Sequence, residues 1–356
     1  MEKKNGFKNF LQRKGIEVSA KKYLIDAMSA MAQGLFASLL IGTILSTLGD
    51  KIGVEFMVTA GNYAKAVTGP AMAISIGYAL NCPNLVLFCL AAVGQAANEL
   101  GGAGGPLAVL VVAIIAAEIG KAISKETKID ILVTPAVTIG VGVILSLLLA
   151  PGLGAAASSF GQLVMWATEL QPFFMGILVS TLVGIALTLP ISSAAICAAL
   201  SLTGLAGGAA VAGCCAQMIG FAVMSFKENK VSGLIAQGIG TSMLQMGNIV
   251  RNPKIWIAPI LTSMITGPLA TCLFKLKMNG AAVASGMGTC GFVGQIGVYT
   301  GWINDISEGT KTAITSFDWI GLVLICFVLP AVLTYIFGNI LRKIGWIKEN
   351  DLKLDL

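Results

Sequence analysis

The stretch that decides the fold is Asn98-Glu99-Leu100-Gly101-Gly102-Ala103-Gly104-Gly105-Pro106. It lies between two apolar runs, Pro83–Ala97 and Leu107–Ala117. Four glycines and a proline do not continue a helix, so we expect the backbone to open here. Inside a membrane, opened backbone persists only where it is buried in protein or lines a wet cavity. With the carboxylate of Glu99 at its edge, the stretch predicts the solute site of a transporter; the alternative is a glycine-rich loop at the membrane surface.

The composition around this stretch is that of a protein embedded in a membrane. Of 356 residues, 56% are hydrophobic and only 11% are charged, whereas soluble domains carry about 25% charged residues. The 43 glycines fit helices that pack closely through small residues. We therefore predict an all-α polytopic membrane protein of about 10–12 spans, with broken or re-entrant hairpins and internal repeats included.

The residue types exclude several kinds of site. The chain has no histidine, which removes the commonest metal ligand and the usual general base. Its eight cysteines lie in apolar runs without a Cys-x-x-Cys pair, which indicates small buried side chains. No G-x-S-x-G motif and no pair of intramembrane acids is present, so an intramembrane enzyme is disfavoured. We expect no catalytic residue, no metal and no cofactor, and the net charge of +6 comes with no nucleic-acid-binding motif.

Basic residues gather at the two ends of the chain. Residues 1–22 carry seven Lys or Arg interleaved with apolar side chains, which predicts an amphipathic basic segment on the inner leaflet or, alternatively, a disordered basic tail. Residues 23–345 are expected to form a single transmembrane domain, and residues 346–356 a short tail. The basic excess predicts that both termini are cytoplasmic, and no cleavable signal peptide is expected.

The first predicted span is Ala27–Leu48. Short apolar arms separated by helix breakers then predict two broken pairs, of which the first is either a tight pair of spans or a re-entrant hairpin. The arms are Thr68–Leu80 with Pro83–Ala97, and Pro190–Leu202 with Ala206–Phe226.

Other segments are harder to place. After the span Ile131–Leu149, the less hydrophobic Gly152–Leu170 is predicted as an outer surface segment. Val231–Val250 is predicted as an unusually polar span, which puts Arg251 and Lys254 on the outer side, against the positive-inside rule. The next span, Ile255–Phe274, then returns inward to Lys275 and Lys277.

Two segments resemble each other and predict an internal repeat. Thr68-Gly69-Pro70 leads to Val93-Gly94-Gln95, and Thr266-Gly267-Pro268 leads to Val293-Gly294-Gln295. A fainter third copy runs from Pro190 to Gln217. Repeats of broken helices are common in secondary transporters, although chance similarity among Gly/Ala-rich segments is the alternative.

Repeated amides in apolar runs are candidates for cavity lining. An amide offers two donors and two acceptor lone pairs, which suits a hydroxyl-rich ligand. The alternative is hydrogen bonding between helices. Glu118 is not included among the candidates, because its spacing of three residues from Lys121 predicts an ion pair on one helix face. The predicted substrate-binding residues are Glu99, Asn98, Gln95, Gln295, Gln33, Gln237, Gln217 and Asn81.

Three signatures resemble the bacterial phosphotransferase-system EIIC-like family that includes the perfringolysin regulator protein. They are the stretch from Glu99 to Pro106, Leu189-Pro190-Ile191-Ser192-Ser193-Ala194-Ala195, and Gly288-Thr289-Cys290-Gly291-Phe292-Val293-Gly294-Gln295. The resemblance covers nearly the whole chain. It implies a sugar-permease subunit, often dimeric, with re-entrant hairpins around the substrate and a glutamate, here Glu99, binding sugar hydroxyls. This chain departs from the family in lacking the histidine that often accompanies that glutamate and the cysteine-bearing EIIB phosphotransfer domain.

These observations predict a transporter of a small polar solute, a sugar, in the bacterial plasma membrane. The expected partners are membrane lipid, a second copy of the chain and a cytoplasmic EIIA- or EIIB-type protein. The alternative is a membrane-embedded sensor that regulates gene expression without transport.

Overall fold

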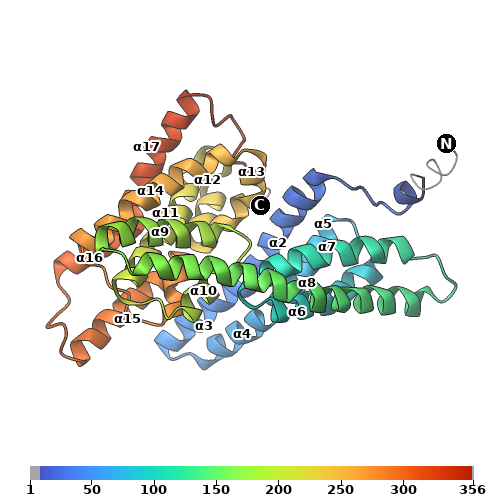
Figure 1. Ribbon diagram of the computed structural model, residues 1–356, viewed down its shortest axis with the longest axis horizontal. Helices are drawn as coiled ribbons and strands as arrows, with labels where there is room; N and C mark the ends of the chain where they lie inside the picture. The colour runs from blue at the N-terminus through green and yellow to red at the C-terminus, as the bar shows by residue number, and fades with distance from the viewer. Residues whose placement is uncertain (1–8, 355–356) are drawn as a thin grey trace. The chain divides into compact units, whose positions relative to one another are not determined.

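Helices make up the architecture of the protein (Figure 1). The structure, a computed structural model, describes residues 9–354, with the side chains of all of these except Lys51 and Ala199. Helices α2 to α8 are α2 (Ala27–Leu35), α3 (Ile41–Ile52), α4 (Glu55–Ala66), α5 (Thr68–Ala79), α6 (Asn84–Gly101), α7 (Gly105–Ile123) and α8 (Asp130–Thr168). Helices α9 to α17 are α9 (Pro172–Thr188), α10 (Ser193–Ala199), α11 (Gly204–Met224), α12 (Phe226–Ile235), α13 (Met246–Arg251), α14 (Ile257–Pro268), α15 (Val293–Ser307), α16 (Ser316–Val323) and α17 (Leu329–Lys343).

Short π-helical and 3-10 turns connect or extend these helices. The π-helical turns are η1 (Lys22–Asp26), η2 (Phe36–Leu40), η4 (Ala236–Gly240), η7 (Leu269–Leu273) and η10 (Leu324–Val328). The 3-10 turns are η3 (Gly102–Gly104), η5 (Ser242–Gln245), η6 (Pro253–Trp256), η8 (Ala282–Gly286) and η9 (Cys290–Phe292).

In the described part of the chain, six helical segments are long and apolar enough to cross a membrane. They are Lys22–Asp50, Asn84–Ile123, Asp130–Thr168, Gly204–Met224, Pro253–Leu273 and Ser316–Lys343. The predicted first span falls within the first of them. Large apolar side chains stay exposed on α8 and α17, for example Leu148 and Tyr335, as expected for surfaces that face lipid. These features confirm an all-α polytopic membrane protein.

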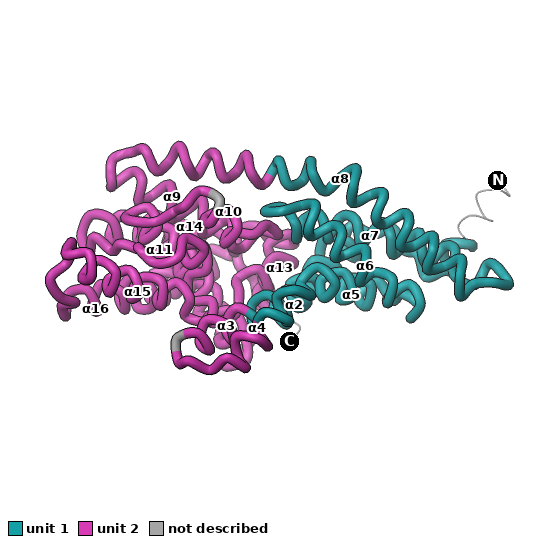
Figure 2. Tube along the Cα trace, turned by 90° about the horizontal axis from the view of Figure 1, so that it is seen from below, with its two compact units in different colours: residues 1–42, 62–156 teal, residues 43–61, 157–356 magenta. Residues whose placement is uncertain are grey.

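The chain divides into two compact units (Figure 2). Unit 1 contains the described residues up to Gly42 together with Asn62–Ala156, and unit 2 contains Thr43–Gly61 and the chain from Ala157 onward. Each unit has its own packing and is described by itself.

Unit 1 is held together by close contacts between helices at small residues. The backbones of α5 and α6 meet at Gly69 and Gly94, where a Cβ on either glycine would come within 2.4 Å of the other's carbonyl oxygen. Helix α7 packs on α8 where Gly120 meets Thr138. Without a hydrophobic force between helices in lipid, such close backbone packing supplies much of the attraction.

Two expectations about helix continuity are corrected. The opening predicted over Asn98–Pro106 is confined to the turn η3, because α6 continues to Gly101 and α7 begins at Gly105. The surface segment predicted at Gly152–Leu170 is instead the second half of α8, which accommodates two prolines within 39 residues. At 1.5 Å per residue, α8 extends about 58 Å, roughly twice the hydrocarbon core of a bilayer.

The first described residues dock on the loop between α7 and α8. Residues 1–8 of the predicted amphipathic segment lie outside the described residues, and residues 9–13 are helical. Glu126 accepts a hydrogen bond from Arg13 at 2.8 Å and forms an ion pair with Lys14 at 2.5 Å. The Lys14 ammonium also donates to the carbonyl of Ser124. This tether joins parts of unit 1 that are more than a hundred residues apart.

We expect acid to release this tether. The hydrogen bond from Lys14, together with the charges of Arg13 and Lys14, lowers the pKa of the Glu126 carboxyl below its usual value. A lowered pKa contributes stability that is complete above the unfolded-state pKa, about 4.3, and is lost as the pH falls through the folded-state value. The protection of residues 9–16 against hydrogen exchange, taken relative to the intrinsic exchange rate at each pH, should therefore be high at pH 7 and fall below about pH 4. Glu126→Gln should exchange fast already at pH 7, whereas Glu17→Gln should behave like the wild type; slow exchange in Glu126→Gln would contradict the tether.

Unit 2 is built around the buried helix α11. Gly213 of α11 lies against the Ser180 carbonyl of α9, and Gln217, further along α11, binds Thr188, further along α9. The two helices therefore run parallel. Helix α14 runs antiparallel to them, with Ser263 accepting a hydrogen bond from Ser180 at 2.7 Å. Helix α17 runs parallel to α11, and its Arg342 donates to the Met224 carbonyl at the end of α11. This end of the bundle, where α11 and α17 finish and α14 begins, is called the basic end below.

The prediction of a membrane span at Val231–Val250 is wrong, because this part of the chain folds back on itself. Asn229 at its start and Gln245 near its end both donate to the same carbonyl, that of Leu352, at 2.7 and 3.0 Å. A straight helix would separate these residues by about 24 Å. The segment is therefore a hairpin, residues 226–254, with its turn at Thr241, where the backbone becomes extended.

This hairpin corrects the predicted sidedness of two loops. Arg251 and Lys254 lie at the basic end, with Lys227, Lys230 and Arg342, rather than opposite to them. The conflict with the positive-inside rule at Arg251 thereby disappears. The same change of direction moves Lys275, which follows α14, to the opposite end of the bundle.

The C-terminal segment, residues 346–354, is clamped across the base of this hairpin. Asn248 donates to the Lys353 carbonyl at 2.9 Å, and Asn252 donates to the Trp346 carbonyl and the Asp351 carboxylate at 2.8 Å each. The side chain of Leu352 is fully buried. A row of side-chain amides thus donates hydrogen bonds to backbone carbonyls of the segment. We call this arrangement the amide clamp.

Loss of the buried leucine should destabilise the clamp. Leu352→Ala is expected to cost about 2–5 kcal/mol, since it leaves a cavity under the clamp. Ile344→Ala, at a side chain that is 59% exposed a few residues earlier, should cost much less. Thermal unfolding in detergent measures both, and equal melting temperatures would show that the segment does not support the fold.

Candidate functional site

Breaks in the helices of unit 2 meet around the middle of α11. Helix α9 ends at Thr188, whose hydroxyl lies 2.8 Å from that of Ser242 at the turn of the hairpin 226–254. The hydroxyl of Ser193, at the start of α10, donates to the Gly286 carbonyl at 2.7 Å. The chain around η9 packs on η4 of the same hairpin and on α11, where Gly288 lies against Cys214. We call this region the break cluster.

The break cluster also contains Gln217, a residue predicted to bind substrate. Its amide oxygen accepts hydrogen bonds from the Trp256 indole at 2.8 Å and from Thr188 at 3.3 Å, and its amide nitrogen donates to Ser263 at 3.4 Å. The side chain is completely buried. Gln217 therefore joins helices and has little capacity left for a ligand.

Gln237 is similarly occupied. Its nitrogen donates to Ser225 and to the Gly233 carbonyl at 2.8 and 2.9 Å, and its oxygen accepts from Gln245 at 2.9 Å. Because Gln245 belongs to the amide clamp, Gln237 supports the clamp from behind.

Gln295 differs from these two amides. Its nitrogen donates only to the sulfur of Cys215, at 3.3 Å, and its oxygen has no hydrogen-bond partner among the described residues. The side chain is 8% exposed. A buried amide oxygen without a partner costs about 1–3 kcal/mol, and buried polar groups in folded proteins nearly always have one, so a bound ligand or water is a natural partner for this oxygen.

In unit 1, Glu99, Gln95 and Asn98 lie together near the turn between α6 and α7. Gln95 donates to the Glu99 carboxylate at 2.5 Å, one helical turn away. Glu99 is exposed, and Asn98 packs against Gly105 at the start of α7. Glu99 stands in the last turn of α6, where the helix dipole disfavours a negative charge, and no ion pair of the described residues includes it. The position is therefore unfavourable for a carboxylate that serves only the fold.

The other predicted residues of unit 1 lie elsewhere. Asn81 is in the loop before α6, so the length of α6 separates it from Glu99 by about 25 Å. Gln33 is on the exposed side of α2. The ion pair predicted for Glu118 and Lys121 is confirmed at 3.0 Å, and Lys121 also donates to the Leu80 carbonyl at 3.0 Å.

The predicted internal repeat is not matched by equivalent packing. Gly69 and Gly94 of the first copy touch each other, whereas Gly267 of the second copy lies against Gly176 of α9 and Gly294 lies against Gly288. The same short glycine motif therefore serves different contacts in the two units.

Comparison with known proteins identifies the family. The sequence model described as "Phosphotransferase system, EIIC" matches residues 25–354. The chain belongs to the phosphotransferase-system EIIC family. No curated protein and no solved structure gives a significant match to this EIIC chain. The family membership makes it a membrane permease component of sugar transport, and it implies cooperation with EIIA- and EIIB-type components.

Several polar residues of the EIIC break cluster were not singled out from the sequence. Thr188 and Ser242 contact across two helix ends, and Trp256 binds Gln217 from the start of α14. For Thr188, the sequence offers one indication, its position directly before Leu189-Pro190. A helix usually ends just before a proline, which leaves the last backbone carbonyls and nearby polar side chains without helical partners. No group of three or more potential metal-ligating side chains occurs among the residues the structure describes.

Proposed function

We propose that this EIIC chain carries a sugar across the plasma membrane and that polar side chains at the helix breaks bind it. The observation that carries the proposal is the break cluster, a buried meeting point of interrupted helices that contains the amide oxygen of Gln295. Interrupted helices at such positions form the binding sites of many transporters, because their free backbone groups and polar side chains can replace water around a solute.

The chemistry of these groups suits a hydroxylated ligand. The Gln295 oxygen can accept a hydrogen bond from a sugar hydroxyl without giving up a protein partner. In unit 1, the Glu99 carboxylate can accept from more than one hydroxyl, and charge-assisted hydrogen bonds of this kind are stronger than neutral ones. Gln95 fixes the carboxylate in place. Asn98 lies beside Glu99 in unit 1, whereas Asn81 and Gln33 lie elsewhere in that unit and have no direct role in this proposal. In unit 2, Gln217 and Gln237 act through the packing of their helices.

We place the basic end of unit 2 and both termini in the cytoplasm, following the positive-inside rule. In this orientation the hairpin 226–254 enters from the cytoplasmic side as a re-entrant hairpin, and its turn reaches the break cluster. Phosphorylation of the sugar would come from separate soluble EIIA- and EIIB-type proteins that approach this end. A homodimer in a lipid bilayer is the proposed assembly.

The proposal is tested by uptake of a panel of sugars into proteoliposomes that contain the purified protein. We expect at least one sugar to enter down its concentration gradient, and Gln295→Leu to lower its initial rate of uptake about tenfold or more, because one hydrogen bond to the solute is lost. Stability should be retained, since leucine removes a buried polar atom without a partner. Gln171→Leu, at an exposed residue before α9, is the matched control.

Two outcomes would count against this function. If no sugar of the panel moves while Gln295→Leu and the wild type remain folded, transport is excluded for that panel, and a ligand-sensing role becomes the better account. If a sugar moves equally well in both proteins, Gln295 is not part of the binding site.

A further inference from the structure

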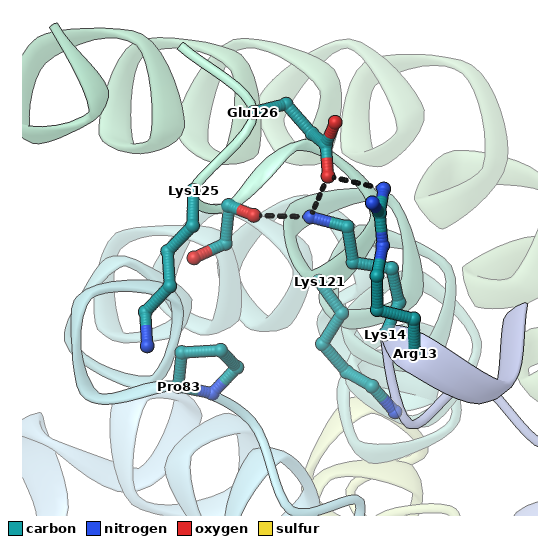
Figure 3. A pocket seen from close by; sticks show the side chains of 7 residues that line it. Arg13, Lys14, Pro83, Lys121, Lys125 and Glu126 are labelled. Carbon is teal, nitrogen blue, oxygen red and sulfur yellow. Dashed lines mark hydrogen bonds and ion pairs between the residues drawn. The ribbon is translucent and has the colours of Figure 1, made fainter. Parts of the chain in front are cut away.

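A basic pocket lies at the end of unit 1 where α7 finishes and α8 begins (Figure 3). Its volume is about 320 Å³. Its lining comes from three distant parts of the chain, namely the N-terminal segment, the loop before α6, and the last turn of α7 together with the loop 124–129. The lining residues are Arg13, Lys14, Pro83, Lys121, Ser124, Lys125 and Glu126.

The pocket holds more positive than negative charge. The Lys121 ammonium is compensated from outside the pocket by Glu118. Of the remaining three cations, Arg13 and Lys14 both pair with Glu126, the single carboxylate of the lining, and Lys125 pairs with none. The docking of the N-terminal segment therefore brings two further cations to a loop that is already basic. An anion of suitable size would relieve this repulsion.

Lys125 is the side chain best placed to meet such an anion. Its backbone adopts a left-handed conformation with φ of 62°, which is uncommon for a residue with a side chain. Asp130 holds this conformation by accepting a hydrogen bond from the Lys125 amide at 2.6 Å, and its other contact is the Thr134 hydroxyl. No ion pair of the described residues includes the Lys125 ammonium. Figure 3 shows this ammonium on the side of the pocket where Pro83 lies.

The surroundings of the pocket indicate where the anion comes from. The loop 124–129 joins two apolar helical segments, Asn84–Ile123 and Asp130–Thr168, that are each long enough to enter a bilayer. Directly beside it, Ile129, Ile131 and Leu132 are 60 to 74% exposed, which fits contact with lipid chains. Basic pockets at the ends of transmembrane helices commonly receive the head groups of anionic lipids.

We propose that this pocket binds a phosphate group, with Arg13 and Lys125 as its principal ligands and Lys14 completing the cradle. The guanidinium of Arg13 matches two phosphate oxygens, and the two ammonium groups supply further donors. Bound phosphate also fastens the N-terminal segment to the loop, because Arg13 and Lys125 then hold the same anion from both sides. The phosphate belongs either to an anionic phospholipid or to a small soluble molecule, and the two sources give different experimental results.

The test compares the full-length wild type with Arg13→Gln/Lys125→Gln and with the control Lys21→Gln/Lys128→Gln. Both double variants lose two exposed positive charges, but the control positions lie outside the pocket lining. Lys14 keeps its ion pair with Glu126 in all three proteins, so the tether is retained. Native mass spectrometry measures binding of phosphatidylglycerol and phosphatidylcholine, and thermal unfolding measures the response to inorganic phosphate.

For a lipid phosphate, the pocket variant should bind phosphatidylglycerol about 30-fold more weakly than the wild type, since each basic side chain near an anionic lipid strengthens binding about fivefold. The control should stay within a few-fold of the wild type, and phosphatidylcholine should bind all three alike. For a soluble phosphate, inorganic phosphate should raise the melting temperature of the wild type and the control only, while phosphatidylglycerol binds all three equally. Either pattern supports the pocket. The proposal is overturned if neither probe distinguishes the pocket variant from the wild type, or if the control loses as much as the pocket variant.

Discussion

Glu99→Gln is expected to reduce sugar uptake about 10- to 150-fold at low sugar concentration while leaving the protein as stable as before. The reduction follows from the loss of a charge-assisted hydrogen bond to the solute, which contributes about 1.5–3 kcal/mol. Glutamine keeps the size of the side chain and its position one turn from Gln95. The effect on binding is therefore separated from any effect on packing.

The stability of this variant makes the experiment decisive. Glu99 lies in the last turn of α6, where a negative charge is unfavourable. Removal of this charge should leave the free energy of unfolding unchanged or raise it by about 0.3–1 kcal/mol, so the melting temperature should not fall. Glu169→Gln, at another exposed carboxylate, should change neither uptake nor stability appreciably. Undiminished uptake by Glu99→Gln would remove Glu99 from the binding site, and a large loss of stability would assign it to the fold.

Gly213→Ala is expected to destabilise unit 2 strongly. A Cβ at this position would lie 1.8 Å from the carbonyl oxygen of Ser180, which is backbone and cannot rotate away. Helices α9 and α11 would have to separate, and with them the hydrogen bonds of Gln217 and Ser180. The cost of such overpacking is about 3 kcal/mol or more, and the yield of folded protein after detergent extraction should fall sharply.

Gly140→Ala in α8 is the matched control for this change. A Cβ there meets no other atom within 4 Å, so the alanine should be neutral or stabilising by up to about 1 kcal/mol through its higher helix propensity. Thermal unfolding of both variants, measured by size-exclusion chromatography after heating, compares them directly. Similar melting temperatures would show that the contact between α9 and α11 is looser than described.

The class of protein and the positions of the helix breaks could be predicted from the sequence because their causes are local. Low charge, long apolar runs and glycine-rich stretches require only the composition of a window. The turn between α6 and α7 and the end of α9 at Thr188 fall where glycine or proline interrupts an apolar run. The ion pair of Glu118 with Lys121 follows from their spacing on one helix.

The direction of the chain after α11 could not be predicted in this way. Gln245 and Asn248 are interpreted from the sequence as polar residues within a membrane span. Their hydrogen-bond partners are backbone carbonyls of residues 352 and 353, about a hundred positions away, which a local pattern does not indicate. Similarly, the lower hydrophobicity of Gly152–Leu170 predicted a surface segment after the span Ile131–Leu149, yet α8 continues from Asp130 to Thr168. The sequence pointed to Gln217, Gln237 and Gln295 equally, and only the hydrogen-bond partners of each amide distinguish Gln295 from the other two.

The amide clamp has a consequence for biosynthesis. Gln245 and the carbonyl that it binds, that of Leu352, are 107 residues apart in the chain, so the carbonyl is added long after the hairpin has been synthesised. The hairpin 226–254 therefore cannot reach its finished state until residues 346–354 have been added to the chain. A chain that stops before residue 346 would leave buried donors of the hairpin without acceptors, which gives cellular quality control a physical means of recognising chains that lack this segment.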